Sequence, residues 1–183
     1  MPDNAFQEGV TPMTRRTNAR IAGFTFLIYI VVGLSSLAVP GTAPAAALLP
    51  VLASFSALVL GVTLYAITRE QDRDLALLAL VCRVIEGAPG EGTIYFAVGS
   101  LLFCWLLLRG RMIPVVLAWL GVVSSALVVA FLPLQIVGYF GGLGSWRSPV
   151  TWCVWLPLLV FEVALGLWLI IKGVAEPAAQ RER

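Results

Sequence analysis

Six apolar stretches separated by short polar segments dominate the pattern of this chain. They extend over approximately Ile21–Val39, Ala45–Ile67, Leu75–Gly87, Thr93–Leu108, Ile113–Phe140 and Val150–Ile171. All but the third are continuous over at least 16 residues, whereas barrel strands alternate over roughly 10 residues. In hydrocarbon a helix also satisfies the hydrogen bonds of its own backbone N–H and C=O groups, which an open sheet cannot do. The pattern therefore predicts transmembrane helices, and the short connections predict sequential helices packed as antiparallel neighbours in one bundle.

The third stretch is short for a membrane span. Leu75–Gly87 would be about 20 Å long as a helix, against a hydrocarbon core of about 30 Å. It must either continue through the Ala88-Pro89-Gly90 segment in irregular form or end inside the protein.

Composition and charge support an integral membrane protein and indicate its orientation. Of the 183 residues, 60% are hydrophobic and 12% are charged, and the mean hydropathy is +0.94, outside the balance of soluble domains. With the N-terminus inside, ten basic residues fall on the cytoplasmic side, namely Arg15, Arg16, Arg20, Arg69, Arg73, Arg109, Arg111, Lys172, Arg181 and Arg183. Only Arg147 falls in an outer loop, and Arg83 lies within the membrane. This distribution predicts an all-α, six-transmembrane-helix bundle with both termini cytoplasmic.

The same pattern suggests a simple domain organisation. We expect a disordered cytoplasmic tail over residues 1–19, a six-helix transmembrane domain over 20–173, and a short cytoplasmic tail over 174–183. A cleaved signal peptide is an alternative, because Arg15-Arg16 precedes an apolar stretch and Thr42–Ala45 offers small residues. An uncleaved anchor is favoured. Without the first helix, the basic residues of the remaining connections would fall on the outer side of the membrane instead of the cytoplasmic side.

Several function classes are disfavoured by what the sequence lacks. There is no histidine, and Cys82, Cys104 and Cys153 lie in apolar segments without short metal-ligand spacing, so they are interpreted as small buried hydrophobes. No glycine-rich phosphate loop or long extramembrane segment is present. The basic residues are dispersed over short segments. We therefore expect no cofactor, no metal, and no nucleotide or nucleic-acid partner.

Three ionisable residues lie where lipid is unfavourable to charge: Arg83, Glu86 and Glu162. A charge at bilayer depth costs about 2.5–3.5 kcal/mol on insertion scales and normally has a partner in the protein interior. Arg83 and Glu86 share a helix face at a spacing of three residues. Counting from the predicted helix ends places Arg83 and Glu162 each about 12 Å from the cytoplasmic side.

If the third and sixth helices meet, one guanidinium faces two carboxylates, and one glutamate is expected to hold a proton at neutral pH. Tyr95, Ser100, Phe161 and Gln135 are candidates to line the site, near the helix breaks expected at Pro133 and Pro157. One alternative is that the three charged groups only fix helix register. Another is that Glu86 and Glu91 lie in a hydrated outer loop, so that only Arg83 and Glu162 are buried. Three tryptophans near the outer end of the last helix are interpreted as an interfacial belt, or alternatively as a substrate-stacking platform; they are Trp146, Trp152 and Trp155.

Four segments resemble a known family. TNARIAGFTFLIYIVVGL, ALVLGVTLYAITREQDRDLALLALVCRVIE, SLLFCWLLLRGRMIP and FEVALGLWLIIKG are similar to the bacterial domain-of-unknown-function family four-three-eight-six. The similarity covers about residues 17–174. The resemblance implies a small polytopic inner-membrane protein without an established general activity, in which Arg83, Glu86 and Glu162 match polar positions of the third and last helices. The segment between Glu86 and Ile94 is shorter than in longer relatives.

These observations lead to three functional hypotheses. The leading one is a protein in the lipid bilayer that binds a lipophilic small molecule or a membrane partner at the Arg83–Glu86–Glu162 cluster. The second is a membrane-embedded cyclase or isomerase acting on an isoprenoid or terpenoid substrate, with a protonated glutamate as general acid. The third is a small proton-coupled carrier.

Overall fold

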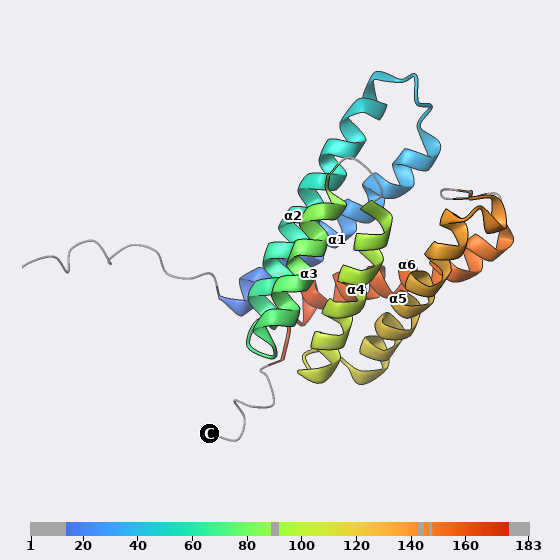
Figure 1. The fold of residues 1–183 in the computed structure, drawn as a ribbon. Coiled ribbons are helices and arrows are strands. Elements are labelled where there is room, and N and C mark those ends of the chain that lie inside the picture. Colours follow the sequence, from blue (N-terminus) through green and yellow to red (C-terminus); the bar gives the residue numbers. More distant parts are fainter. Residues whose placement is uncertain (1–13, 89–91, 143–144, 147, 176–183) are drawn as a thin grey trace, which may run out of the picture.

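A computed structural model describes residues 14–88, 92–142, 145–146 and 148–175, and all regular structure in these ranges is helical. The elements, in chain order, are α1 (Arg15–Ala38), η1 (Pro44–Ala47), α2 (Leu48–Thr68), α3 (Arg73–Glu86), α4 (Gly92–Arg109), α5 (Val115–Ile136), η2 (Tyr139–Gly141) and α6 (Pro149–Ile171). Figure 1 shows the six α-helices as one bundle. The predicted all-α class is confirmed.

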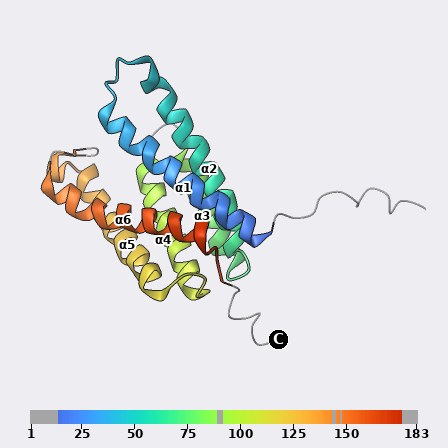
Figure 2. The same cartoon turned by 180° about the vertical axis from the view of Figure 1, so that it is seen from behind.

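The six α-helices form a closed ring. Each packs on its neighbours in sequence, and α6 packs back on α1, as the front and back views in Figures 1 and 2 show. The connected ends of α1 and α2 diverge from those of α5 and α6 in both views. α3 and α6 are not neighbours in this ring, so any contact between their polar side chains must be made through the interior of the bundle.

Glycine allows the contact between α1 and α6 that closes the ring. A Cβ added at Gly23 would lie 2.6 Å from the carbonyl oxygen of Gly166, closer than real Cβ contacts. The absence of a side chain at Gly23 therefore lets the two backbones approach each other directly, as small residues do in membrane helix pairs.

Five of the helices are long and apolar enough to cross a membrane: α1, α2, α4, α5 and α6. Their outward faces are apolar as well, since Phe55 is 67% and Val116 83% exposed. Such large apolar side chains on an exposed surface are typical of contact with lipid. The chain is therefore a multi-pass helical membrane protein.

The third span predicted from the sequence is α3, which has 14 residues and does not meet the length required of a span. Its helix ends at Glu86, and Gly87 is its C-terminal cap. The irregular continuation expected through Ala88-Pro89-Gly90 lies mostly outside the described residues. The count of six spans, and the cytoplasmic position of both termini, stay predictions.

Charged residues gather at one end of the bundle, where α1 and α3 begin and α2 and α4 end. Arg15 pairs with Glu70 at 3.1 Å, and Arg109 with Asp72 at 3.4 Å. The Asp72 carboxylate also accepts a hydrogen bond from the Leu75 backbone N–H and so caps α3. Of the basic residues used to predict orientation, Arg147, Arg181 and Arg183 lie outside the described residues.

Most helix bounds agree with the apolar stretches, with two clear differences. α1 begins at Arg15, because the Thr14 hydroxyl accepts a hydrogen bond from the Thr17 backbone N–H and caps the helix there; residues 15–19, assigned above to the N-terminal tail, are thus helical. α5 ends at Ile136, before the apolar stretch does, because Gly138 adopts a left-handed conformation with φ of 93°.

Candidate functional site

The Arg83 guanidinium lies in the core, where 1% of the residue is exposed. Its Nη1 donates to Glu86 Oε2 at 2.9 Å, within the same face of α3, and its Nη2 donates to Ser100 Oγ on α4 at 2.8 Å. The guanidinium carbon also lies 4.9 Å from the centre of the Phe96 ring, a cation–π distance. The spacing of three residues noted in the sequence therefore produces a buried ion pair, and Ser100 is one of its partners.

A glycine on α2 leaves room for the Arg83 side chain. A Cβ at Gly61 would lie 2.9 Å from the Arg83 Cβ and 3.0 Å from a methyl carbon of Leu80. Gly61 therefore lets α3 pack closely enough to bury the arginine stem. Sequence analysis did not identify this glycine, because nothing in the sequence shows which helix faces Arg83.

Glu86 has a second partner that sequence analysis also missed. Tyr29 Oη, on α1, donates to Glu86 Oε1 at 2.5 Å. Both carboxylate oxygens of Glu86 are thus engaged, one by Arg83 and one by Tyr29. The sequence does offer one indication of this contact: Tyr29 lies in an apolar helix, and a buried Tyr hydroxyl usually has a hydrogen-bond partner.

Glu162 lies on α6 and is 6% exposed. Its Oε1 atom is buried and has no hydrogen-bond partner among the described residues, and the same holds for Nε of Arg83. Both residues line a small internal cavity of about 10 Å³, together with Ser100 and Phe161. The side chains from α3 and α6 therefore approach one interior space, but Glu162 forms no ion pair with Arg83 among the described contacts.

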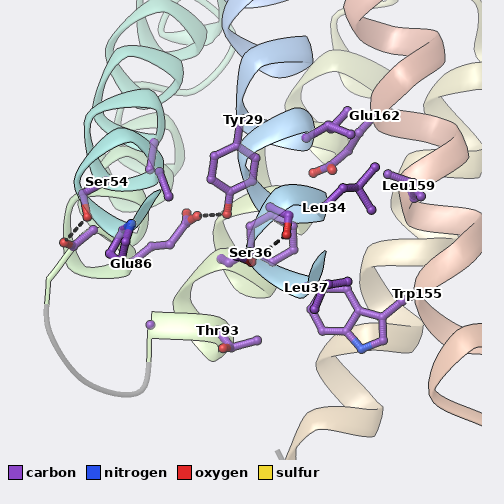
Figure 3. Close-up of a pocket in the computed structure, with 18 of the residues that line it drawn as sticks. Tyr29, Leu34, Ser36, Leu37, Ser54, Glu86, Thr93, Trp155, Leu159 and Glu162 are labelled. Carbon is purple, nitrogen blue, oxygen red and sulfur yellow. Dashed lines mark hydrogen bonds between the residues drawn. The ribbon is translucent and has the colours of Figure 1, made fainter. Parts of the chain in front are cut away.

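A much larger cavity lies beside this cluster, with a volume of about 970 Å³. Its walls come from α1, α2, α4 and α6, together with Glu86 at the end of α3 and residues of neighbouring loops, and they are mainly apolar. The polar side chains on it are Tyr29, Ser36, Ser54, Glu86, Thr93 and Glu162. Figure 3 shows Glu86 and Glu162 approaching the cavity from different helices, with Tyr29 between them in that view. Arg83 is not among the residues that line it.

Aromatic rings form part of the cavity wall. Phe96 lies between Tyr29 and Trp155, with centroid distances of 6.1 and 5.9 Å and interplanar angles of 19° and 16°. Trp146 and Trp152 line the same cavity, and 42% of Trp152 is exposed. The three tryptophans interpreted as an interfacial belt thus also line the large cavity.

The remaining candidates lie elsewhere. Tyr95 is 39% exposed and does not line either cavity. Gln135 is buried and donates to the Thr151 hydroxyl at 3.3 Å, which links α5 to α6. Phe161 packs in the core and lines only the small cavity. Their roles in a binding site stay predictions.

The described residues contain no cluster of three or more His, Cys, Asp or Glu side chains placed to hold a metal ion. The cysteines are free, and Cys82 and Cys104 are buried, as expected for small hydrophobes. The expectation was wrong for Cys153, which is exposed, because its position on α6 faces outward.

The fold and the cavity define a class: a multi-pass helical membrane protein with a buried arginine–glutamate pair beside an apolar cavity. Residues 90–173 match the model of the family described as Domain of unknown function (DUF4386). The resemblance predicted from the sequence is confirmed over this range, which covers α4, α5 and α6 and includes Glu162. Neither a curated protein nor a solved structure matches the chain.

Proposed function

We propose that this protein binds a lipophilic small molecule in the 970 Å³ cavity, with Glu86 and Glu162 at its polar side. The observation that carries the proposal is the cavity itself. Its volume lies at the upper end of the range for ligand pockets, about 300–1,000 Å³, and it combines apolar walls with a few convergent polar groups, as such pockets do.

The apolar lining continues onto the outer surface. Leu34, Val51 and Phe55 line the cavity and are also 46%, 63% and 67% exposed. A ligand dissolved in the bilayer would therefore meet a continuous apolar path from the lipid to the two glutamates. We propose that the protein lies in the inner membrane with six spans and cytoplasmic termini, so that the charged end of the bundle faces the cytoplasm.

Two glycines allow a matched test of the cavity. A Cβ at Gly33 or at Gly41 would meet no atom within 4 Å, but only Gly33 lines the cavity. Gly33→Phe should therefore introduce a ring at the cavity wall with no clash at its Cβ, whereas Gly41→Phe places the same ring outside the cavity.

The binding measurement is quenching of tryptophan fluorescence by 11-bromoundecanol in nanodiscs of zwitterionic lipid. We expect saturable quenching of the wild type and of Gly41→Phe, and an apparent affinity lower by about tenfold or more, about 1.4 kcal/mol, in Gly33→Phe. Equal saturable quenching in all three proteins, or none above lipid partition, would contradict the proposal.

A catalytic role is the second candidate, favoured by the unpartnered Oε1 of Glu162 and by the aromatic wall beside it. A carboxylic acid in such a position could protonate an alkene or epoxide, and aromatic rings stabilise the cationic charge that develops. Glu162→Gln would then abolish isoprenoid cyclisation or isomerisation in a protein that still folds. Unchanged product formation in this variant would remove Glu162 as the acid.

A further inference from the structure

We infer that the ligand of this cavity is a lipophilic amine, bound as an ammonium by the carboxyl group of Glu162. The inference rests on the proposed function, because it names the chemical class of the molecule that the cavity takes. It follows from three independent features of the site: its charges, its engaged hydrogen-bond donors and its aromatic wall.

The charges of the site are unequal. Arg83 is neutralised by Glu86, at 2.9 Å, and Tyr29 satisfies the other oxygen of Glu86. Glu162 is left as a second acid without a cationic partner among the described contacts. A carboxylate in an apolar site is unfavourable unless it is paired, and a single positive charge from a ligand would balance it. If Glu162 holds a proton before binding, that proton passes to the amine nitrogen, and the same ion pair results.

Hydrogen-bond donors near Glu162 are largely engaged elsewhere. Of the hydroxyl groups that line the cavity, Tyr29 donates to Glu86, Ser36 to the Gly33 carbonyl and Ser54 to the Gly87 carbonyl. The fourth, Thr93, is exposed. Figure 3 shows the Glu162 carboxylate at the cavity, with no hydrogen bond drawn to it from the other residues. None of these four hydroxyls donates to the Glu162 carboxyl group among the described contacts, so a bound molecule can supply a donor to it.

The walls favour a cation over an anion. No described residue that lines the cavity carries a positive charge, so a carboxylate or phosphate head group would lack a counter-ion there. The faces of Tyr29, Phe96 and Trp155 instead attract cations, and Phe96 already has the Arg83 guanidinium at 4.9 Å. An alcohol is the remaining neutral competitor, since it offers Glu162 a donor without a charge.

Three probes with one tail separate these head groups: 11-bromoundecylamine, 11-bromoundecanol and 11-bromoundecanoate. Binding is measured by tryptophan quenching in zwitterionic nanodiscs, with Gly33→Phe as the background. We expect the amine to bind about tenfold or more tightly than the alcohol, and the acid to bind most weakly. In Glu162→Gln the preference for the amine over the alcohol should fall below about twofold.

Asp74→Asn is the matched control, because it neutralises an exposed carboxylate at the start of α3, at the opposite end of the bundle from the cavity. It should keep the tenfold preference. Glu162→Asp retains the acid on a shorter side chain, so it should prefer the amine more strongly than Glu162→Gln does. Equal binding of amine and alcohol by the wild type, or a preference that survives Glu162→Gln, would overturn the inference while the proposed function stands. Absence of saturable binding by all three probes would overturn both.

Discussion

At the residue scale, the buried ionisable groups differ in whether they have a partner in the interior. Arg83 and Glu86 satisfy each other, whereas Glu162 keeps a free oxygen. Removing one partner of a buried ion pair leaves the other charge uncompensated, which costs about 3–5 kcal/mol, whereas replacing both by apolar residues is often neutral.

We therefore expect Arg83→Met to destabilise the protein by about 3–5 kcal/mol, and Arg83→Met combined with Glu86→Leu to recover most of that loss. The free energy of unfolding of each variant, measured by titration with a denaturing detergent, gives the difference in stability. A double variant as unstable as the single one would show that Arg83 acts through Ser100 and Phe96 rather than through its carboxylate.

Tyr29 offers a second residue-scale prediction. Tyr29→Phe keeps the ring that stacks on Phe96 but removes the donor to Glu86 Oε1, which leaves a buried acceptor unsatisfied and should cost about 1–3 kcal/mol of stability. Tyr95→Phe is the matched control, because Tyr95 is exposed, and it should change stability by less than about 0.5 kcal/mol. Equal losses in the two variants would exclude the Tyr29–Glu86 bond as a stabilising contact.

At the element scale, the sequence predicted the helices well because continuous apolar stretches and short polar connections mark spans directly. It identified Arg83, Glu86 and Glu162 for the same reason: ionisable groups are conspicuous in apolar helices. It did not distinguish Tyr29 from Tyr95, because a helix that is apolar on every side gives no pattern to show which face is buried. The role of the tryptophans in the cavity depends on how α6 lies against α1 and α4, which is a property of packing.

The contact between α1 and α6 can be tested with two glycines of one helix. Gly23→Ala would bring a methyl group within 2.6 Å of the Gly166 carbonyl, whereas Gly33→Ala meets open space. We expect Gly23→Ala to destabilise the bundle by about 1–3 kcal/mol, and Gly33→Ala to be neutral or slightly stabilising. Thermal unfolding of both variants in one detergent checks this, and equal melting temperatures would contradict the close approach.

At the scale of the whole molecule, the ring of helices encloses one polar cluster and places it beside an apolar cavity. Because α3 is short, the number of membrane crossings depends on whether it and its flanking residues complete a span. Reporter fusions after residues 41, 110 and 142 locate the α1–α2, α4–α5 and α5–α6 connections, and a fusion after residue 183 locates the C-terminus. The proposed topology expects 110 and 183 in the cytoplasm and 41 and 142 outside; an N-terminus and a C-terminus on opposite sides would rule out six spans.

The central claim is that a lipophilic molecule enters the space between α1, α2, α4 and α6, beside Glu86 and Glu162. Photolabelling in native membranes with a diazirine derivative of dodecanol, followed by peptide mapping, tests it most directly. α5 is an internal control, because it contributes no described residue to the cavity yet exposes apolar side chains such as Val116 and Val123. We expect labelling of α1 and α6 that excess dodecanol suppresses, and labelling of α5 that it does not. Labelling distributed equally over the three helices and insensitive to dodecanol would contradict the claim.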